Sequence, residues 1–75
     1  MANLVGTILV NADLSGANLY GANLSGADLA GADIGGANFG LATLDGATMT
    51  GLLNASTTAT NFDGASLQEA TLGGY

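Results

Sequence analysis

The fold is decided by a run of five-residue units, the clearest being Ala12-Asp13-Leu14-Ser15-Gly16 and Ala17-Asn18-Leu19-Tyr20-Gly21. The pattern begins at Ala2 and continues unbroken to Gly51. Leu52-Leu53-Asn54 then interrupt it, and four further units follow. The chain of 75 residues therefore holds fourteen units, with one residue outside the pattern at each end. A repeat this regular governs the interpretation of the whole chain.

A period of five fits neither an α-helix nor a plain β-strand. The third residue of a unit is large and apolar, and the first is small, usually Ala. Alternation along an extended segment places these two on one side, so the second residue, commonly Asn or Asp, faces outward. Gly in the fifth position supplies the positive φ of a tight turn. A chain that turns at every fifth residue winds into a solenoid with a small aliphatic interior, and each coil pairs with the next.

Units such as Ala22-Asn23-Leu24-Ser25-Gly26 resemble the pentapeptide repeat family, whose pattern is A-(D/N)-L-x-x. The resemblance covers nearly the whole chain. It implies an all-β fold, a right-handed quadrilateral β-helix with four units per coil. Leu, Ile, Met or Phe would fill the interior beside the Ala side chains. Fourteen units at four per coil would make about 3.5 coils, in a single domain spanning residues 1–75.

The sequence allows a test of the four-sided coil, because units four apart should share a side. If residues 52–54 loop out of one corner, Phe39 and Phe62, the only phenylalanines of the chain, stack on each other. An outward ladder of amides accompanies them: Asn18, Asn38 and Asn61. A rival alignment, with residues 50–54 as a unit, separates the rings and breaks the ladder. We therefore predict a corner insertion at 52–54.

Composition argues against several classes of function. Lys, Arg, His, Pro, Cys and Trp are absent, and the net charge is -6. Without cations the chain is not expected to bind nucleic acid directly. Without His, Lys or Cys it lacks the usual general bases, activated nucleophiles and Cys/His metal ligands. We expect no enzyme activity, no metal and no cofactor.

Three outward features have competing interpretations. Asp13 and Asp33 would lie one coil spacing apart, about 5 Å, similar to the carboxylate pair of retaining glycosidases. A convex wall offers no pocket for such chemistry, so solvated surface charge is favoured. The Asn ladder could bind a ligand or ice, but a structural role is favoured because stacked amides satisfy one another. Glycosylation sequons at Asn23 and Asn54 would matter only in a secreted protein.

The compartment stays open. The apolar start, residues 1–10, lacks a basic region typical of signal peptides. No stretch approaches the roughly 18 apolar residues of a spanning helix. We therefore expect a soluble chain without a membrane partner.

The coil ends are the strongest functional candidates. Most solenoids need polar caps to stay monomeric, and no Pro or Lys protects either edge here. The predicted end-to-end interface comprises Leu4, Leu9, Leu14, Leu19, Phe62, Leu67, Leu72 and Tyr75. In the predicted corner loop, Leu52 and Leu53 could form a contact patch or fold back over the coil, and both interpretations stay open.

Two functions follow. The first is a structural solenoid that associates with itself, head to tail, into a filament or scaffold. The second rests on the family resemblance, since some pentapeptide repeat proteins mimic B-form DNA and inhibit DNA gyrase. Its partner would be a DNA-binding protein. The net charge of -6 agrees in sign, but six acids over 3.5 coils are sparse beside the one charge per about 1.7 Å of duplex DNA.

Overall fold

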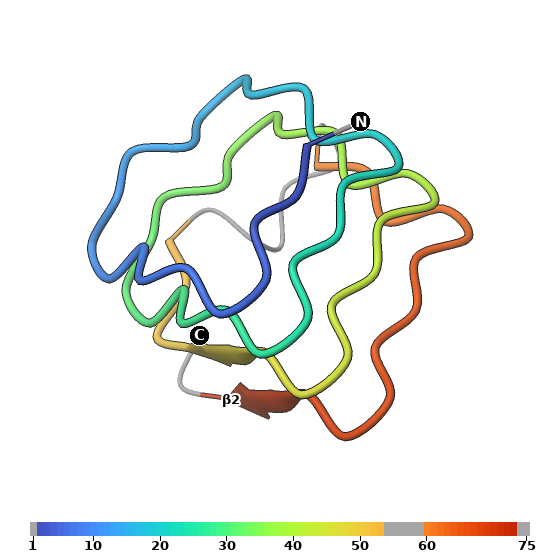
Figure 1. The fold of residues 1–75 in the computed structure, drawn as a ribbon. Coiled ribbons are helices and arrows are strands. Elements are labelled where there is room, and N and C mark those ends of the chain that lie inside the picture. Colours follow the sequence, from blue (N-terminus) through green and yellow to red (C-terminus); the bar gives the residue numbers. More distant parts are fainter. Residues whose placement is uncertain (1, 54–59, 74–75) are drawn as a thin grey trace.

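The chain winds into coils that lie one above the next, as Figure 1 shows. The computed structural model describes residues 2–53 and 60–73. Asn3 pairs in parallel with Asn23, and Asn23 with Thr43, so one turn of the coil takes twenty residues. Twenty residues are four units of five. Each coil therefore has four sides.

Most sides of a coil meet the next coil through a single parallel bridge. In the described part of the chain, only two segments pair for longer. Strand β1, Thr48–Thr50, lies beside strand β2, Thr71–Gly73, in parallel (Figure 1). The register joins Thr48 to Thr71 and Met49 to Leu72.

Three backbone hydrogen bonds join most units to the unit above; in the unit 32–36, the amide of Gly36 donates instead to the Thr60 hydroxyl at 3.2 Å. The amides of Leu14 and Gly16 donate to the carbonyls of Asp33 and Gly35, both at 2.8 Å. The amide of Asp33 donates back to the carbonyl of Ala12 at 2.9 Å. In general terms, the amides of the third and fifth residues donate to carbonyls of the coil above, and the carbonyl of the first residue accepts an amide of the coil above. This pattern recurs on all four sides.

The corner of each unit is a hydrogen-bonded turn. The amide of Ala17 donates to the carbonyl of Leu14 at 3.0 Å, and Gly16, the third residue of that turn, has φ 70°. The carboxylate of Asp13 accepts the amide of Ser15 at 3.0 Å. This contact between a side chain and the backbone two residues on is a typical Asx turn. The same contact is made by Asn3, Asn18, Asn23, Asp28, Asp33, Asn38 and Asn61.

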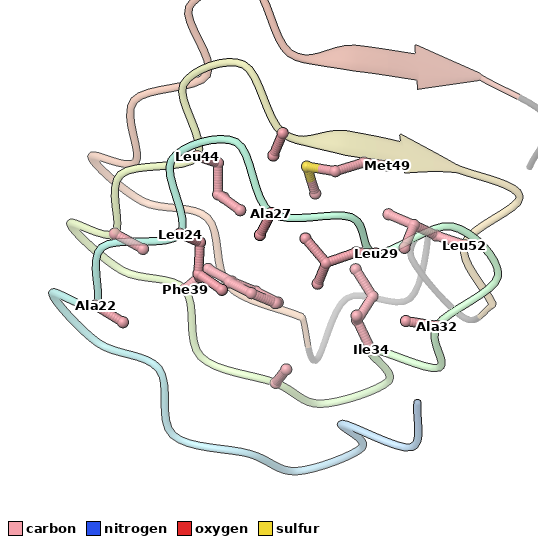
Figure 2. Packing of buried hydrophobic residues seen from close by; sticks show 13 residues of the cluster. Ala22, Leu24, Ala27, Leu29, Ala32, Ile34, Phe39, Leu44, Met49 and Leu52 are labelled. Atoms are coloured by element: carbon pink, nitrogen blue, oxygen red, sulfur yellow. The ribbon is translucent and has the colours of Figure 1, made fainter. Parts of the chain in front are cut away.

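The interior is a column of apolar side chains, shown in Figure 2. In the part of the chain that the structure describes, the thirteen buried apolar residues all lie between Ala22 and Leu52. The largest of them are Phe39, Leu24, Leu29, Ile34, Leu44 and Met49. The leucines of the first coil pack against this core but are only partly buried, since one coil covers them from one side.

The predicted aromatic stack is confirmed. The ring centroids of Phe39 and Phe62 are 5.0 Å apart, and the rings are within 3° of parallel. On the outside of the same side, Asn38 bridges to both Asn18 and Asn61. The alignment that would have separated the two rings is therefore excluded.

The extra residues do not begin where we predicted. Leu53 pairs with Asp33 at the regular spacing of twenty residues, whereas Asn61 pairs with Asn38 at a spacing of twenty-three. The register therefore changes between residues 53 and 61. Of the predicted insertion 52–54, Asn54 lies outside the described residues.

Burial and backbone pairing explain why Leu52 and Leu53 continue the regular coil. Leu52 takes the first position of a unit and is 97% shielded, with 3% of its surface exposed. The amide of Leu53 donates to the carbonyl of Ala32 at 2.8 Å, and its carbonyl accepts the amide of Ile34 at 3.1 Å. A corner loop would lose both hydrogen bonds and expose Leu52, whose burial contributes about 2 kcal/mol.

Three corners of the described coils carry a residue other than glycine at positive φ: Asn11, Leu41 and Glu69, with φ of 60°, 55° and 60°. The Asn11 side chain fills the space where a β-carbon on Gly31, in the next coil, would stand. Leu41 does the same at Gly64. A non-glycine corner is thus compatible with the next coil because that coil has glycine there.

The Phe39–Phe62 stack should show as an energetic coupling. In a double-mutant cycle with Phe39→Leu and Phe62→Leu, we expect about 0.5–1.5 kcal/mol of coupling beyond the two single losses. Urea unfolding followed by circular dichroism measures it. A control cycle with Phe39→Leu and the exposed Val5→Ala should be additive. Additivity of the two phenylalanine variants would contradict a stabilising stack.

The corner contact can be tested with two alanine substitutions. Gly26→Ala and Gly31→Ala impose the same positive φ, which costs roughly 1–2 kcal/mol. Nothing lies within 4 Å of a β-carbon at Gly26. Gly31→Ala should cost a further ~0.5–1.5 kcal/mol, because Asn11 is forced off its rotamer. That excess in the unfolding free energy should vanish when Asn11→Gly is added, and its persistence would refute the contact.

Candidate functional site

The wall of the coil offers little for catalysis. Residues 2–53 and 60–73 enclose no pocket, bury no charged side chain, and contain no cluster of three or more His, Cys, Asp or Glu. The same residues form no helix long and apolar enough to cross a membrane.

The candidate carboxylate pair takes part in the turns of the coil. Asp13 and Asp33 face each other across a parallel bridge. The Ser15 hydroxyl donates to Asp13 at 2.6 Å and the Ser15 amide at 3.0 Å. These two bonds, the hydroxyl first, lower the pKa of Asp13 below its ordinary value. A general acid would need the opposite shift, so this geometry favours an ionised group that caps a turn.

The Asn ladder is occupied by contacts within the fold. The side-chain oxygens of Asn18, Asn38 and Asn61 accept the amides of the residues two positions on, at 3.1, 2.9 and 2.8 Å. The Asn61 amide group also donates to the oxygen of Asn38 at 3.2 Å. The ladder thus supports the coil, in line with the structural interpretation of the sequence.

The N-terminal end of the stack exposes one edge of the first coil. Its leucines, Leu4, Leu9, Leu14 and Leu19, are half-buried against the core. Among the described residues, no backbone partner exists for the amides and carbonyls of the second residue of each unit. These residues are Asn3, Ile8, Asp13 and Asn18. The edge therefore combines apolar side chains with open donors and acceptors.

The C-terminal end presents the opposite edge. Phe62 is half-buried, while Leu67 and Leu72 are 36% and 51% exposed. In the described part of the chain, the amides of Leu67 and Glu69 and the carbonyl of Ala65 have no backbone partner. Tyr75, the remaining predicted interface residue, lies outside the described residues.

The predicted corner contact divides into two unlike residues. Leu52 belongs to the core, and Leu53, 55% exposed, lies on the outer wall beside Asp33. The two leucines therefore do not form one surface patch. Glu69 is an end residue that is absent from the predicted interface, although the sequence contains a signal for it. It is one of the few fifth positions not occupied by glycine.

The comparisons agree with this geometry. A family model described as pentapeptide repeats matches residues 2–34 and 22–52, with eight copies. A pentapeptide repeat protein from the cyanobacterium Cyanothece 51142 is 39% identical, with a TM-score of 0.68, over 95% of this chain and 43% of that one. A comparison with curated proteins gives no significant match.

Two further solved structures are similar. HetL from the cyanobacterium Nostoc sp. strain PCC 7120, a pentapeptide repeat protein involved in heterocyst differentiation regulation, is 30% identical with a TM-score of 0.65. The match covers 92% of this chain and 38% of HetL. A pentapeptide repeat protein from the Arabidopsis thaliana thylakoid lumen is 30% identical, with a TM-score of 0.50, over 95% of this chain and 50% of that one.

The chain spans half or less of the length of these three structures. They imply a right-handed β-helix-type fold. Proteins of this kind are generally structural or interaction proteins and not enzymes. The repeat pattern, the four-sided coil and the matches lead to one conclusion: the chain belongs to the pentapeptide repeat family.

Proposed function

We propose that this chain is a non-enzymatic structural solenoid that associates with further copies of itself, head to tail, into a filament or scaffold. The observation that carries the proposal is the match between the open backbone groups of its two ends. The N-terminal edge presents the amide and carbonyl of second residues. The C-terminal edge presents amides of third and fifth residues and carbonyls of first residues. These are the groups that pair between coils in the interior.

Apolar burial acts in the same direction. Full burial of a leucine contributes about 1.5–3 kcal/mol, so covering its exposed half contributes roughly 1 kcal/mol. The leucines of the first coil would meet Phe62, Leu67 and Leu72 of the second copy, as they meet the second coil within their own chain.

A contact between two different ends does not close on itself, so it propagates. With 3.5 coils per copy and about 4.8 Å per coil, each copy would add roughly 17 Å along the axis. The half coil would turn each copy by about 180°.

The alternative function is an acidic DNA mimic that binds a DNA-binding protein such as gyrase. It would need a continuous track of negative charge. The acids are instead divided among the four sides: Asp13 and Asp33 on one, Asp28 on the next, and the rest on the other two. We therefore favour self-association.

Salt should separate the two functions, because they respond in opposite directions. Two copies of charge -6 about 17 Å apart repel by roughly 9 kcal/mol in unscreened water. At physiological ionic strength, with a Debye length of about 8 Å, roughly 1 kcal/mol remains. Self-association, measured by sedimentation velocity, should therefore tighten more than about tenfold between 10 and 150 mM salt. Binding of a cationic partner through charge would weaken instead.

A charge placed at the end should abolish assembly. Leu72→Glu puts a carboxylate into the apolar contact, and its desolvation costs at least about 2 kcal/mol, more than tenfold in affinity. Leu41→Glu is the matched control, since Leu41 is similarly exposed, at 56%, but lies in the middle of the stack. Sedimentation and electron microscopy should show loss of assembly in the first variant only. Equal assembly by both variants, with folding verified by circular dichroism, would exclude end-to-end association.

A further inference from the structure

We propose that two copies join in one register. The lower copy contributes its C-terminal end and the upper copy its N-terminal end. Asp13 of the upper copy lies beside Ser66 of the lower copy, and Gly16 of the upper copy lies above Glu69 of the lower copy. The register depends on the proposed self-association and specifies how the two ends fit. It follows from the step at each end of a helical coil, from the backbone groups, and from the corners.

The surface of the C-terminal end rises gradually around the last coil, like a ramp, and drops by one coil spacing at a single step. Leu53 lies above Asp33, on one side of the coil. The chain then continues over the other three sides. There Asn61, Ser66 and Thr71 lie above Asn38, Thr43 and Thr48 of the coil below. After the side of Thr71, the next side is that of Leu53, which stands one coil lower. The step therefore falls between these two sides.

The N-terminal end is a matching ramp. It rises from residues 2–6 through residues 17–21, and Asn23 then lies above Asn3. Figure 1 shows the two ramps at opposite ends of the stack, blue to cyan and orange to red. Two ramps fit without a gap when their steps coincide. Residues 2–6 of the upper copy then lie on the side of Leu53, and residues 12–16 lie above residues 65–69.

This register pairs open backbone groups with one another. The amide of Leu67 meets the carbonyl of Asp13, and the amide of Asp13 meets the carbonyl of Ala65. The amide of Glu69 meets the carbonyl of Ser15. In the part of the chain that the structure describes, none of these six groups has a backbone partner. The arrangement repeats the three bonds between units within the chain.

The corners are also compatible. Glu69 is a non-glycine corner with φ 60°, so the corner above it must leave room for its side chain. Gly16 has no β-carbon, and Gly31 and Gly64 accommodate the side chains of Asn11 and Leu41 in this way within the chain. A shift by one side that brings residues 7–11 above residues 65–69 would place Asn11 above Glu69 and stack two non-glycine corners. Within the described coils, each non-glycine corner with a coil above it faces glycine.

Disulfide trapping tests the register directly, because the chain has no cysteine. Asp13→Cys with Ser66→Cys would place two α-carbons about 4.8 Å apart across the contact, within the 4.4–6.8 Å range that a disulfide spans. Within one copy these residues pair elsewhere, Asp13 with Asp33 and Ser66 with Thr43. Any disulfide between them therefore joins two copies. Dissolved oxygen serves as the oxidant, accepting the two electrons and two protons of the thiols.

Three matched variants report the other registers. Each combines Ser66→Cys with one further outward position: Asn3→Cys, Ile8→Cys or Asn18→Cys. Thr43→Cys with Ser66→Cys is the positive control, because it should close within one chain. We expect a ladder of covalent multimers on non-reducing gels for the Asp13 pair alone, and its loss on adding a reductant.

Wild-type sedimentation distinguishes the two ways of failing. If the wild type stays monomeric at high concentration and high salt, self-association and register both fail. If it assembles but another pair forms the ladder, the register is overturned and the proposed function stands. If it assembles and no test pair forms a ladder while the Thr43 control closes, the register is likewise overturned.

Discussion

The amides and carbonyls of each coil must pair with the next coil, and this requirement shapes every unit. The same groups recur above one another each twenty residues when the chain turns at every fifth residue. The turn leaves the amide of the fourth residue to be satisfied, and in eight units the Asn or Asp of the second position accepts it. Where Ser66 replaces that residue, Asp45 of the coil below accepts both the Ser66 hydroxyl and the Gln68 amide, at 2.6 and 3.0 Å. The requirement thus survives a change of side chain.

The family resemblance implied four units per coil, and with four units per coil the Phe39–Phe62 stack could be predicted because it depends only on spacing. The role of the Asn and Asp side chains could not, since spacing shows that they face outward but not that they turn back to the backbone. The position of the three extra residues also could not be predicted from the sequence. The first position of a unit is usually Ala, so a leucine at residue 52 does not suggest the start of a unit. Only the burial of Leu52 and the pairing of Leu53 show that the coil continues there.

Apolar side chains are buried more completely in the middle of the stack than at its ends, so the end coils are less stabilised. Among residues 2–53 and 60–73, every buried apolar side chain lies between Ala22 and Leu52, where a coil has neighbours on both sides. In a solenoid each repeat is stabilised mainly by its neighbours, so an end coil gains about half of what an inner coil gains. Adding a coil to either end recovers the other half. The ends are therefore the surface where a further contact stabilises the molecule most.

Charge also bears on the direction in which copies would meet in the proposed filament. The wall carries acids on all four sides and no cation anywhere, so two walls repel whichever sides they present. The groups that pair between coils are neutral amides and carbonyls, and the interior is aliphatic. Contact along the axis would therefore use attractions that do not depend on side-chain charge, whereas lateral contact would bring two acidic walls together. An acidic wall with open neutral ends would therefore favour growth of the proposed filament in one dimension, provided that salt screens the net charge.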